Sequence, residues 1–413
     1  MYLATPVIVL RLLTRGMRHG SYHQRWPERF GVFPAPGLSG SLWVHAVSVG
    51  EVNAAEPLIK ALKRAYPQAP LVVTTVTPTG SERVRQLFGD GVFHVYLPYD
   101  LPFAVRRFLH RVRPRLAIIV ETEIWPNLYF ACHRHGIPLM IVNARLSERS
   151  LRGYRAARAL VRAALRCVSH VSAQSRTDAA RYRMLGVPSD KVVVSGNLKF
   201  DMPVPEQAQE RGEALRVQWG PLRPVWIAAS THEGEELAVL EAHLEVLQRF
   251  PDALLLLAPR HPDRFRLVEH LVRNLGFSTG TRSGNRVPAP AHQVFVIDAM
   301  GELMPFFAAS DLAFIGGSLV PIGGHNVLEP AALSRPVLVG PHTFNFDDIT
   351  QTMVQQGGAQ RVAGSDALGA AVLQLLRDRA SLHRMGERAH AVFDSEQGAV
   401  RRVMTLIDHT LGE

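Results

Sequence analysis

The segment Leu42-Trp-Val-His-Ala-Val-Ser-Val-Gly-Glu51 contains the features that decide the fold of this chain. Its first six residues form an apolar run that is typical of a buried strand. The run leads through Gly50 into a tight turn, after which we expect a helix from Glu51 through Ala65. A strand that passes directly into a helix is the repeating unit of a parallel sheet with helices on both faces.

The same alternation of strand and helix continues along the chain. Further strands are expected at 71–76, 116–120, 139–142, 168–173 and 191–194, and, after a proline-marked break at 201–206, at 225–229, 253–258, 294–297, 312–315 and 336–339. A chain of 413 residues is also too long for one compact core. We therefore predict an α/β protein with two Rossmann-like domains whose parallel sheets face a central cleft, where ligands bind. Its parts are an N-terminal segment at 1–30, a first domain at 31–204, and a second domain at 205–413 that includes the C-terminal helices.

Composition narrows the class of partner. Hydrophobic residues make up 47% and charged residues 20% of the chain, which excludes a disordered protein. The two cysteines, Cys132 and Cys167, have no neighbours at metal-ligand spacing, so neither a disulfide framework nor a structural zinc is expected. The net charge of +10 indicates an anionic partner. Nucleic acid is disfavoured because no nucleic-acid-binding motif occurs, which leaves a membrane surface or a phosphorylated substrate.

The N-terminal segment favours a membrane. Residues 1–13 are mostly apolar, and basic residues follow at Arg15, Arg18, His19 and Arg25. The apolar run is shorter than the roughly 20 residues that span a bilayer, and it does not end in a small-residue cleavage site. We expect a helix on the anionic cytoplasmic leaflet, the alternative being a helix that packs on the protein's own surface.

Charged residues follow three expected strands of the first domain. Glu51 opens the helix after the first strand, where the helix macrodipole alone would favour a carboxylate. Glu121 and Glu123 follow the strand at 116–120, and either could instead cap the helix ahead of Pro126. Lys199 lies near the domain boundary, where it could neutralise an anionic substrate or simply pair with Asp201.

The second domain carries features of a phosphate site. The segments 229–236 and 316–330 each follow a strand, and their hydroxyls, glycines and backbone N–H groups suit an anion at a helix N-terminus. Arg260 could bind phosphate through two hydrogen bonds, and Glu329 could accept hydrogen bonds from ribose hydroxyls. No Walker A loop, dinucleotide fingerprint or metalloprotease motif is present, so we expect metal-independent chemistry.

These motifs together resemble one family over nearly the whole chain, the 3-deoxy-D-manno-octulosonic acid (Kdo) transferases of lipopolysaccharide synthesis. The residues that carry the resemblance are 45–51, 77–83, 96–100, 121–127, 143–147, 196–201, 230–235, 259–261, 300–302, 323–329 and 340–345.

The resemblance implies a GT-B fold, CMP-Kdo as donor, a lipid A precursor (lipid IV-A) as acceptor, and a place on the cytoplasmic side of the inner membrane. It implies no cofactor and no metal. Glu51 would be the proton acceptor, and Glu121 and Lys199 would stabilise the transition state. Contacts to CMP would come from Pro259, Arg260, Met300, Gly301, Glu302, Asn326, Val327, Leu328 and Glu329. Relatives often have proline where this chain has Val327.

Two rival interpretations remain open. One is another GT-B enzyme, either a transferase with a different donor or an epimerase that binds a UDP-sugar. The other is a non-catalytic nucleotide sensor or membrane scaffold. The non-catalytic interpretation predicts that Glu51→Ala would leave every measure of activity unchanged.

Overall fold

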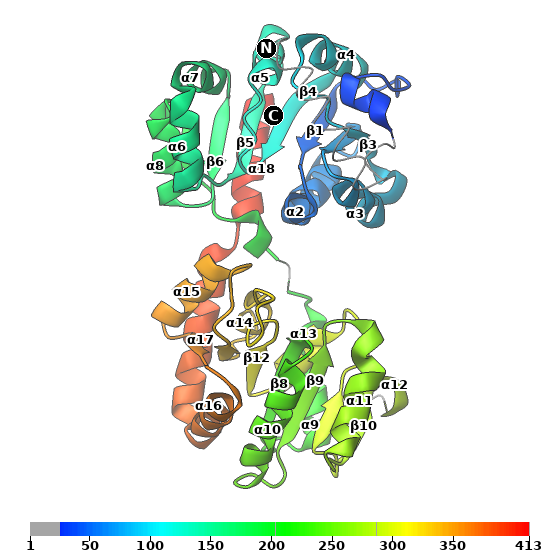
Figure 1. Cartoon of the computed structure of the whole chain (residues 1–413), viewed down its shortest axis with the longest axis vertical. Coiled ribbons are helices and arrows are strands. Elements are labelled where there is room, and N and C mark those ends of the chain that lie inside the picture. Colours follow the sequence, from blue (N-terminus) through cyan, green and yellow to red (C-terminus); the bar gives the residue numbers. More distant parts are fainter. Residues whose placement is uncertain (1–24, 203, 286, 413) are drawn as a thin grey trace. The chain divides into compact units, whose positions relative to one another are not determined.

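The computed structural model describes residues 25–202, 204–285 and 287–412, which form two compact units (Figure 1). The first unit comprises residues up to 202 together with 396–413, and the second comprises 203–395. The segment at 1–24, on which most of the predicted membrane helix falls, lies outside the described residues.

The first unit is built on a seven-stranded sheet in the order β3-β2-β1-β4-β5-β6-β7, with every neighbouring pair parallel. Its strands are β1 (Ser41–His45), β2 (Leu71–Thr75), β3 (Phe93–Tyr96), β4 (Pro114–Val120), β5 (Leu139–Ala144), β6 (His170–Ala173) and β7 (Val192–Val194). Its helices are α2 (Val49–Ala65), α3 (Pro78–Phe88), α4 (Pro102–Val112), α5 (Pro126–Arg134), α6 (Glu148–Ala156), α7 (Arg158–Arg166), α8 (Arg176–Met184) and α18 (Ala399–Leu411).

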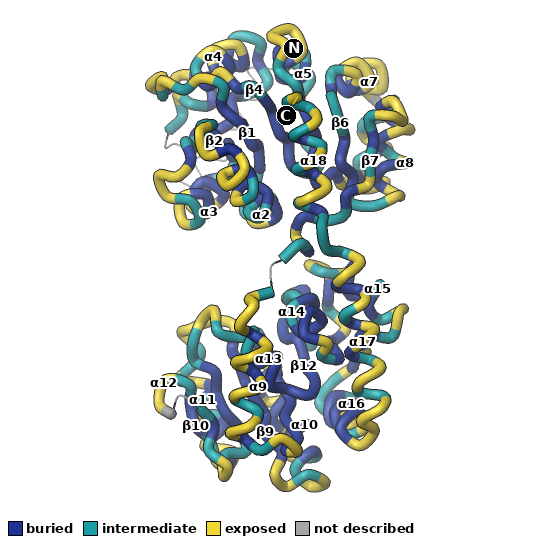
Figure 2. The backbone as a smooth tube through the Cα atoms, turned by 180° about the vertical axis from the view of Figure 1, so that it is seen from behind, coloured by how far each residue is buried: buried dark blue, intermediate teal, exposed yellow. Residues whose placement is uncertain are grey.

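Helices cover both faces of this sheet, because successive side chains of a strand point to opposite faces. Trp43 of β1 belongs to one buried cluster with Ile119 of β4, whereas its neighbour Val44 belongs to the other with Ile118. Figure 2 shows the strands buried and the outer sides of the helices exposed. The continuous apolar runs in the sequence reflect this burial on two faces.

The second unit repeats the design with the strand order β10-β11-β9-β8-β12-β13-β14, again all parallel. Its strands are β8 (Val225–Thr231), β9 (Leu254–Pro259), β10 (Thr279–Thr281), β11 (Val294–Val296), β12 (Leu312–Ile315), β13 (Val337–Val339) and β14 (Ala359–Arg361). Its helices are α9 (Gln207–Trp219), α10 (Glu235–Leu247), α11 (Phe265–Asn274), α12 (Arg282–Asn285), α13 (Leu303–Ala309), α14 (Leu328–Ala331), α15 (Asp347–Gln355), α16 (Ser365–Arg377) and α17 (Arg379–Glu396).

Three strands, β3, β10 and β14, were not predicted. Each lies at an edge of its sheet and has only three or four residues. An edge strand pairs on one side only, and these three include polar residues or glycine, so their sequences lack the apolar run that marks the central strands.

The C-terminal helix α18 corrects the predicted domain boundaries. Residues 396–413 belong to the first unit, although the sequence placed all of 205–413 in the second domain. Ala399, Val403 and Ile407 of α18 are buried in one cluster with Leu58 and Leu62 of α2. An apolar stripe shows that a helix packs against something, but its sequence does not say against which domain.

Arg25 also differs from its predicted role as a membrane-facing cation. Its guanidinium lies 2.6 Å from the Glu28 carboxylate and donates a hydrogen bond of 2.9 Å to the carbonyl oxygen of His94. The next arginine, Arg29, is buried and donates to the carbonyl oxygen of Val76. The described part of the 1–30 segment therefore packs on the first unit.

Candidate active site

The charged residues predicted for the first unit gather at its topological switch point. The strand order places β1 beside β4, and the chain winds outward from this pair in both directions. In open α/β sheets, ligands bind beyond the carboxyl ends of the strands at such a point. Glu51 follows β1, and Glu121 directly follows β4.

Glu51 lies in the first turn of α2, and its carboxylate folds back over the turn before the helix. It accepts a hydrogen bond of 2.7 Å from the backbone N–H of Val47, and the Ser48 hydroxyl lies at 3.5 Å. Burial raises the pKa of the Glu51 carboxyl to about 8; the Val47 N–H opposes this shift, and the charges of Glu121 and Glu123 add to it. Glu51 therefore does lie at a helix start, where the macrodipole favours a carboxylate. The same carboxyl group also titrates near neutral pH.

Glu121 and Lys199 contact each other. The ammonium nitrogen of Lys199 lies 3.3 Å from a carboxylate oxygen of Glu121. Glu121 has a φ of 62°, in the left-handed region that non-glycine residues seldom adopt, which orients its side chain at a cost in backbone strain. The alternative pairing of Lys199 with Asp201 is wrong, because Asp201 accepts hydrogen bonds from the backbone N–H groups of Gly398 and Val400 at the start of α18.

The alternative that Glu121 or Glu123 caps helix α5 is wrong as well. The N–H groups of Asn127 and Leu128 donate to the Asp100 carboxylate, at 3.0 and 2.8 Å. Glu123 instead accepts a hydrogen bond of 2.8 Å from the Trp125 indole. Burial raises the pKa of Glu123. The hydrogen bond from Trp125 opposes this shift, and the charge of Glu121 adds to it.

The first unit thus brings together all three predicted catalytic residues, as the ion pair and the pKa of Glu51 show. A carboxylate with a pKa near 8 is a strong enough base to remove a proton from a hydroxyl group as that group attacks. Lys199, which pairs with Glu121, can stabilise negative charge. The arrangement is suited to general-base catalysis of group transfer.

The second unit has a corresponding switch point between β8 and β12, with a carboxylate of a different kind. Glu235, at the start of α10, is completely buried and accepts hydrogen bonds from four backbone N–H groups. The donors, 2.6–2.9 Å away, are His232, Gly317, Ser318 and Leu319. These N–H groups of the glycine-rich loop were predicted to hold an anionic ligand, but the chain's own carboxylate occupies them. Glu235 fixes the loop in position.

Two histidines lie beside this loop. The Nε2 atoms of His232 and His325 are 2.7 Å apart, so one ring must donate a proton to the other. Burial lowers the pKa of His325 to about 4, and His232 and Arg260 contribute to the shift. Both pKa values are lowered, so both imidazoles are neutral at pH 7. A bound anion would favour protonation of the histidine pair, because it would stabilise the positive charge.

One group of the predicted CMP contacts follows β9 and β12, the two strands on either side of β8 in the second sheet. Pro259 ends β9, and the exposed guanidinium of Arg260 has no hydrogen-bond or ion-pair partner among the described residues. Across the switch point, the Asn326 amide lies 3.4 Å from the Glu329 carboxylate and accepts a hydrogen bond from the Leu328 N–H. Burial raises the pKa of Glu329, against the effects of Asn326 and Arg260. Val327 and Leu328 are buried, so only their backbones can reach a ligand.

The remaining predicted contacts follow β11. Met300 is exposed, and Gly301 has a φ of 79° that favours glycine. The Glu302 carboxylate lies 2.6 Å from the Arg282 guanidinium. Gly301 and Glu302 line a cavity of about 850 Å³ with residues of α9 and α13, which is large enough for a small ligand.

Three positioning residues were not identified as such from the sequence. They are Asp100, Glu235 and Asn143; the last accepts the Leu198 N–H and so holds the turn that carries Lys199. Asn143 is buried and has a φ of 51°. The one signal in the sequence for its role was a polar residue at the end of an apolar strand. Among the described residues, no cluster of three or more His, Cys, Asp or Glu side chains could hold a metal ion.

Comparisons with known proteins place this geometry in one family. Residues 24–202 match the family model of the 3-deoxy-D-manno-octulosonic-acid transferases. The chain is 42% identical to the 3-deoxy-D-manno-octulosonic acid transferase of Haemophilus influenzae, over 97% of this chain and 95% of the relative. It is 38% identical to that of Bordetella pertussis, over 98% and 97%.

Among solved structures, UDP-GlcNAc 2-epimerase from Neisseria meningitidis aligns with a TM-score of 0.56 at 16% identity, over 89% of this chain and all of the other. That likeness concerns the fold alone. It agrees with two doubly wound domains of the GT-B type, the predicted fold class. The level and extent of identity to the transferases decide the family, and with it the enzyme class. This chain belongs to the 3-deoxy-D-manno-octulosonic acid transferase family of glycosyltransferases.

Proposed function

We propose that this Kdo transferase moves Kdo from CMP-Kdo to a hydroxyl group of a lipid A precursor, lipid IV-A, with Glu51 as general base and inversion at the anomeric carbon. The observation that carries the proposal is the environment of Glu51. A partly buried carboxyl group with a pKa of about 8 lies at the switch point, near the ion pair of Glu121 and Lys199.

The reaction requires one proton to leave the acceptor as one bond forms. The ionised Glu51 takes the hydroxyl proton while the oxygen attacks the anomeric carbon of Kdo, and the bond from that carbon to the CMP phosphate breaks. A positioned base contributes about 10²–10⁴-fold to such a step. A single displacement from the face opposite the leaving group inverts the configuration.

The leaving group carries a phosphate charge, which the second unit is equipped to bind. We assign Arg260 to the phosphate and Glu329 with Asn326 to the nucleoside. The loop held by Glu235 supplies a fixed backbone next to them. Transfer by these groups needs no cofactor and no protein-bound metal.

The acceptor is a bisphosphorylated lipid, so the enzyme must work at a membrane. The +10 net charge and the apolar, basic 1–24 segment support a place on the cytoplasmic face of the inner membrane. None of the helices within the described ranges is long and apolar enough to span a bilayer. Deletion of residues 1–15 should weaken flotation with anionic vesicles; unchanged flotation would contradict a role for this segment.

Donor selection tests the reaction. Purified enzyme with lipid IV-A should release CMP from CMP-Kdo and should not turn over UDP-sugars. Mass spectrometry of the lipid product would show the addition of Kdo and count the residues added. Epimerisation of a UDP-sugar, or the absence of any turnover with CMP-Kdo, would overturn the proposal in favour of one of its rivals.

A further inference from the structure

A second feature of the first unit lies away from Glu51 and is rich in arginine. The segment Arg106-Arg-Phe-Leu-His-Arg-Val-Arg-Pro-Arg115 runs from the end of α4 into the start of β4. It forms much of the wall of a pocket of about 710 Å³, to which His135 and Ile137 contribute from the chain after α5. We call this feature the arginine pocket.

The arginine pocket lies at the opposite edge of the sheet from the catalytic carboxylates. Ser39 and Gly40 precede β1 and Pro114 begins β4, whereas Glu51 and Glu121 follow the carboxyl ends of these strands. The seven residues of β4 separate the two edges by about 20 Å, at roughly 3.3 Å a residue. The pocket is therefore not part of the site that contains Glu51.

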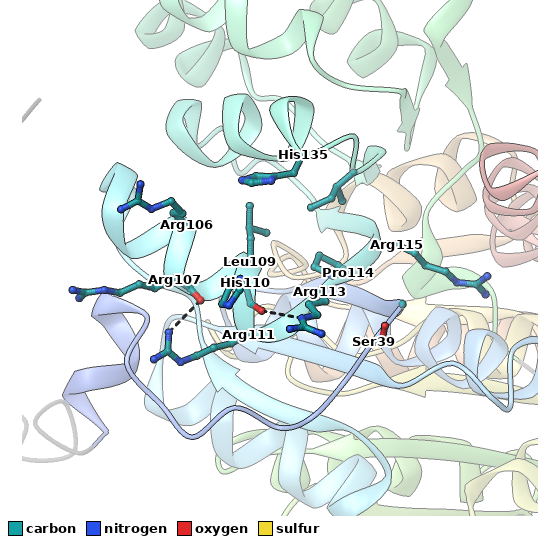
Figure 3. Close-up of a pocket in the computed structure, with 12 residues that line it drawn as sticks. Ser39, Arg106, Arg107, Leu109, His110, Arg111, Arg113, Pro114, Arg115 and His135 are labelled. Carbon is teal, nitrogen blue, oxygen red and sulfur yellow. Dashed lines mark hydrogen bonds between the residues drawn. The ribbon is translucent and has the colours of Figure 1, made fainter.

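Positive charge gathers in this pocket. Among the described residues, five arginines and two histidines line it, and no Asp or Glu does. The hydrogen bonds that Arg111 and Arg113 make within the described residues go to carbonyl oxygens, those of Phe33, Arg107 and His110. Figure 3 shows the guanidinium groups of Arg106, Arg107, Arg111 and Arg113 on one side of the view, whereas that of Arg115 points away from them and lies over the Tyr66 ring.

The helix macrodipole explains only part of this cluster. One or two cations are favoured by the free carbonyl groups at the end of α4. That effect falls off within the last turn, so it does not explain Arg106 and Arg107, which precede the last turn of α4. Arg113 also adopts a φ of 44°, where glycine or asparagine would be less strained.

The chemistry of the pocket indicates its ligand. Arginine binds phosphate in preference to most anions because its planar N–H groups match pairs of phosphate oxygens. Between the arginines, Leu109, Pro114 and Ile137 supply apolar wall. The exposed cations Arg106, Arg107 and Arg113 beside an apolar wall suit the surface of an anionic bilayer, where many phosphates are presented together.

We propose that the arginine pocket binds the phosphate headgroups of anionic phospholipids and so forms a membrane contact of the folded domain, separate from the N-terminal segment. This inference does not depend on Kdo transfer, because vesicle binding measures it directly. Each arginine near an anionic surface should strengthen association by about fivefold.

Flotation of the full chain with vesicles of phosphatidylcholine, with and without phosphatidylglycerol, tests the proposal. The pocket variant carries Arg106→Gln, Arg107→Gln and Arg113→Asn; all three arginines are exposed, and asparagine tolerates the backbone at 113. The control variant carries Arg149→Gln, Arg152→Gln and Arg176→Gln, three exposed arginines of α6 and α8 with the same loss of charge. Equal melting temperatures would confirm that both variants fold.

The pocket variant should lose at least about tenfold in affinity for phosphatidylglycerol vesicles, and the control variant much less. Equal affinities in the two variants would overturn the proposal. So would a calorimetric signal for inorganic phosphate that the pocket variant loses while its vesicle binding stays unchanged, because the ligand would then be a soluble phosphate. Deletion of residues 1–15 in the same assay separates this contact from the one proposed for the N-terminal segment.

Discussion

The two units place a glutamate at the same position, at the switch point of a seven-stranded parallel sheet, and use it in opposite ways. Glu51 accepts one short hydrogen bond from a backbone N–H, which opposes a rise in its pKa; burial, helped by two like charges nearby, still raises that pKa to about 8. Glu235 is completely buried and accepts four hydrogen bonds from backbone N–H groups. A carboxylate whose oxygens already accept all their hydrogen bonds fixes a loop in position, whereas a partly buried carboxylate with few donors can take up a proton.

The largest effect should come from Glu51. Glu51→Ala and Glu51→Gln should lower the rate of transfer by about 10²–10⁴-fold, because neither side chain can take a proton from the acceptor. Binding of CMP should persist, since its predicted contacts all lie in the second unit. Turnover is followed by CMP release and binding by calorimetry. Near-normal turnover in either variant would remove Glu51 from its role as base.

Glu235→Gln should mainly lower the stability of the second unit. The substituted amide presents an NH₂ group to backbone N–H donors, so buried groups lose their partners and the second unit should lose about 3 kcal/mol of unfolding free energy. Scanning calorimetry measures this loss. Glu233→Gln, a change two residues away on an exposed side chain, is the matched control and should be nearly neutral. If Glu235→Gln were equally harmless, the contrast between the two glutamates would fail.

The histidine pair tests whether the second switch point responds to an anion. His325→Asn removes the hydrogen bond to His232, which should raise the KM for the donor by about 2–10-fold and leave kcat nearly unchanged. Initial rates over a range of CMP-Kdo concentrations separate the two constants. A loss confined to kcat would place the pair in the chemical step instead.

The smallest effect should be a change in pH dependence. Glu51 must be ionised to act, so kcat/KM should rise with pH through about 8 and then level off. Glu123→Gln removes a negative charge that raises the pKa of Glu51, so the rise should move to lower pH by less than about one unit. Glu148→Gln, an exposed change on α6, should leave the profile in place. A shift to higher pH in Glu123→Gln would contradict the electrostatic explanation.

Much of the fold was predictable because central strands of a parallel sheet are buried on both faces. The runs at 42–47 and 116–120 became β1 and β4, with boundaries that moved by one or two residues. The edge strands were missed because they lack that burial. The assignment of α18 was wrong because its apolar stripe is equally compatible with either domain.

The candidate site, too, could be predicted only in part. The ends of strands and the starts of helices could be recognised in the sequence, so Glu51, Glu121 and Lys199 were named from the sequence and by resemblance. The fold brings these three residues together. The competing explanations for Glu121, Glu123 and Lys199 could be rejected only in three dimensions, because Asp100 and Asp201 take the capping positions.

By itself, the sequence determined the order of the central strands and of the helices between them, the two-domain plan and the family, since these rest on local periodicity and on ordered motifs. Only the tertiary structure decided which carboxylates are chemical and which are structural. That distinction depends on burial and on how many N–H groups reach each oxygen, and these donors come from segments that are distant along the chain, such as Glu235 and Gly317.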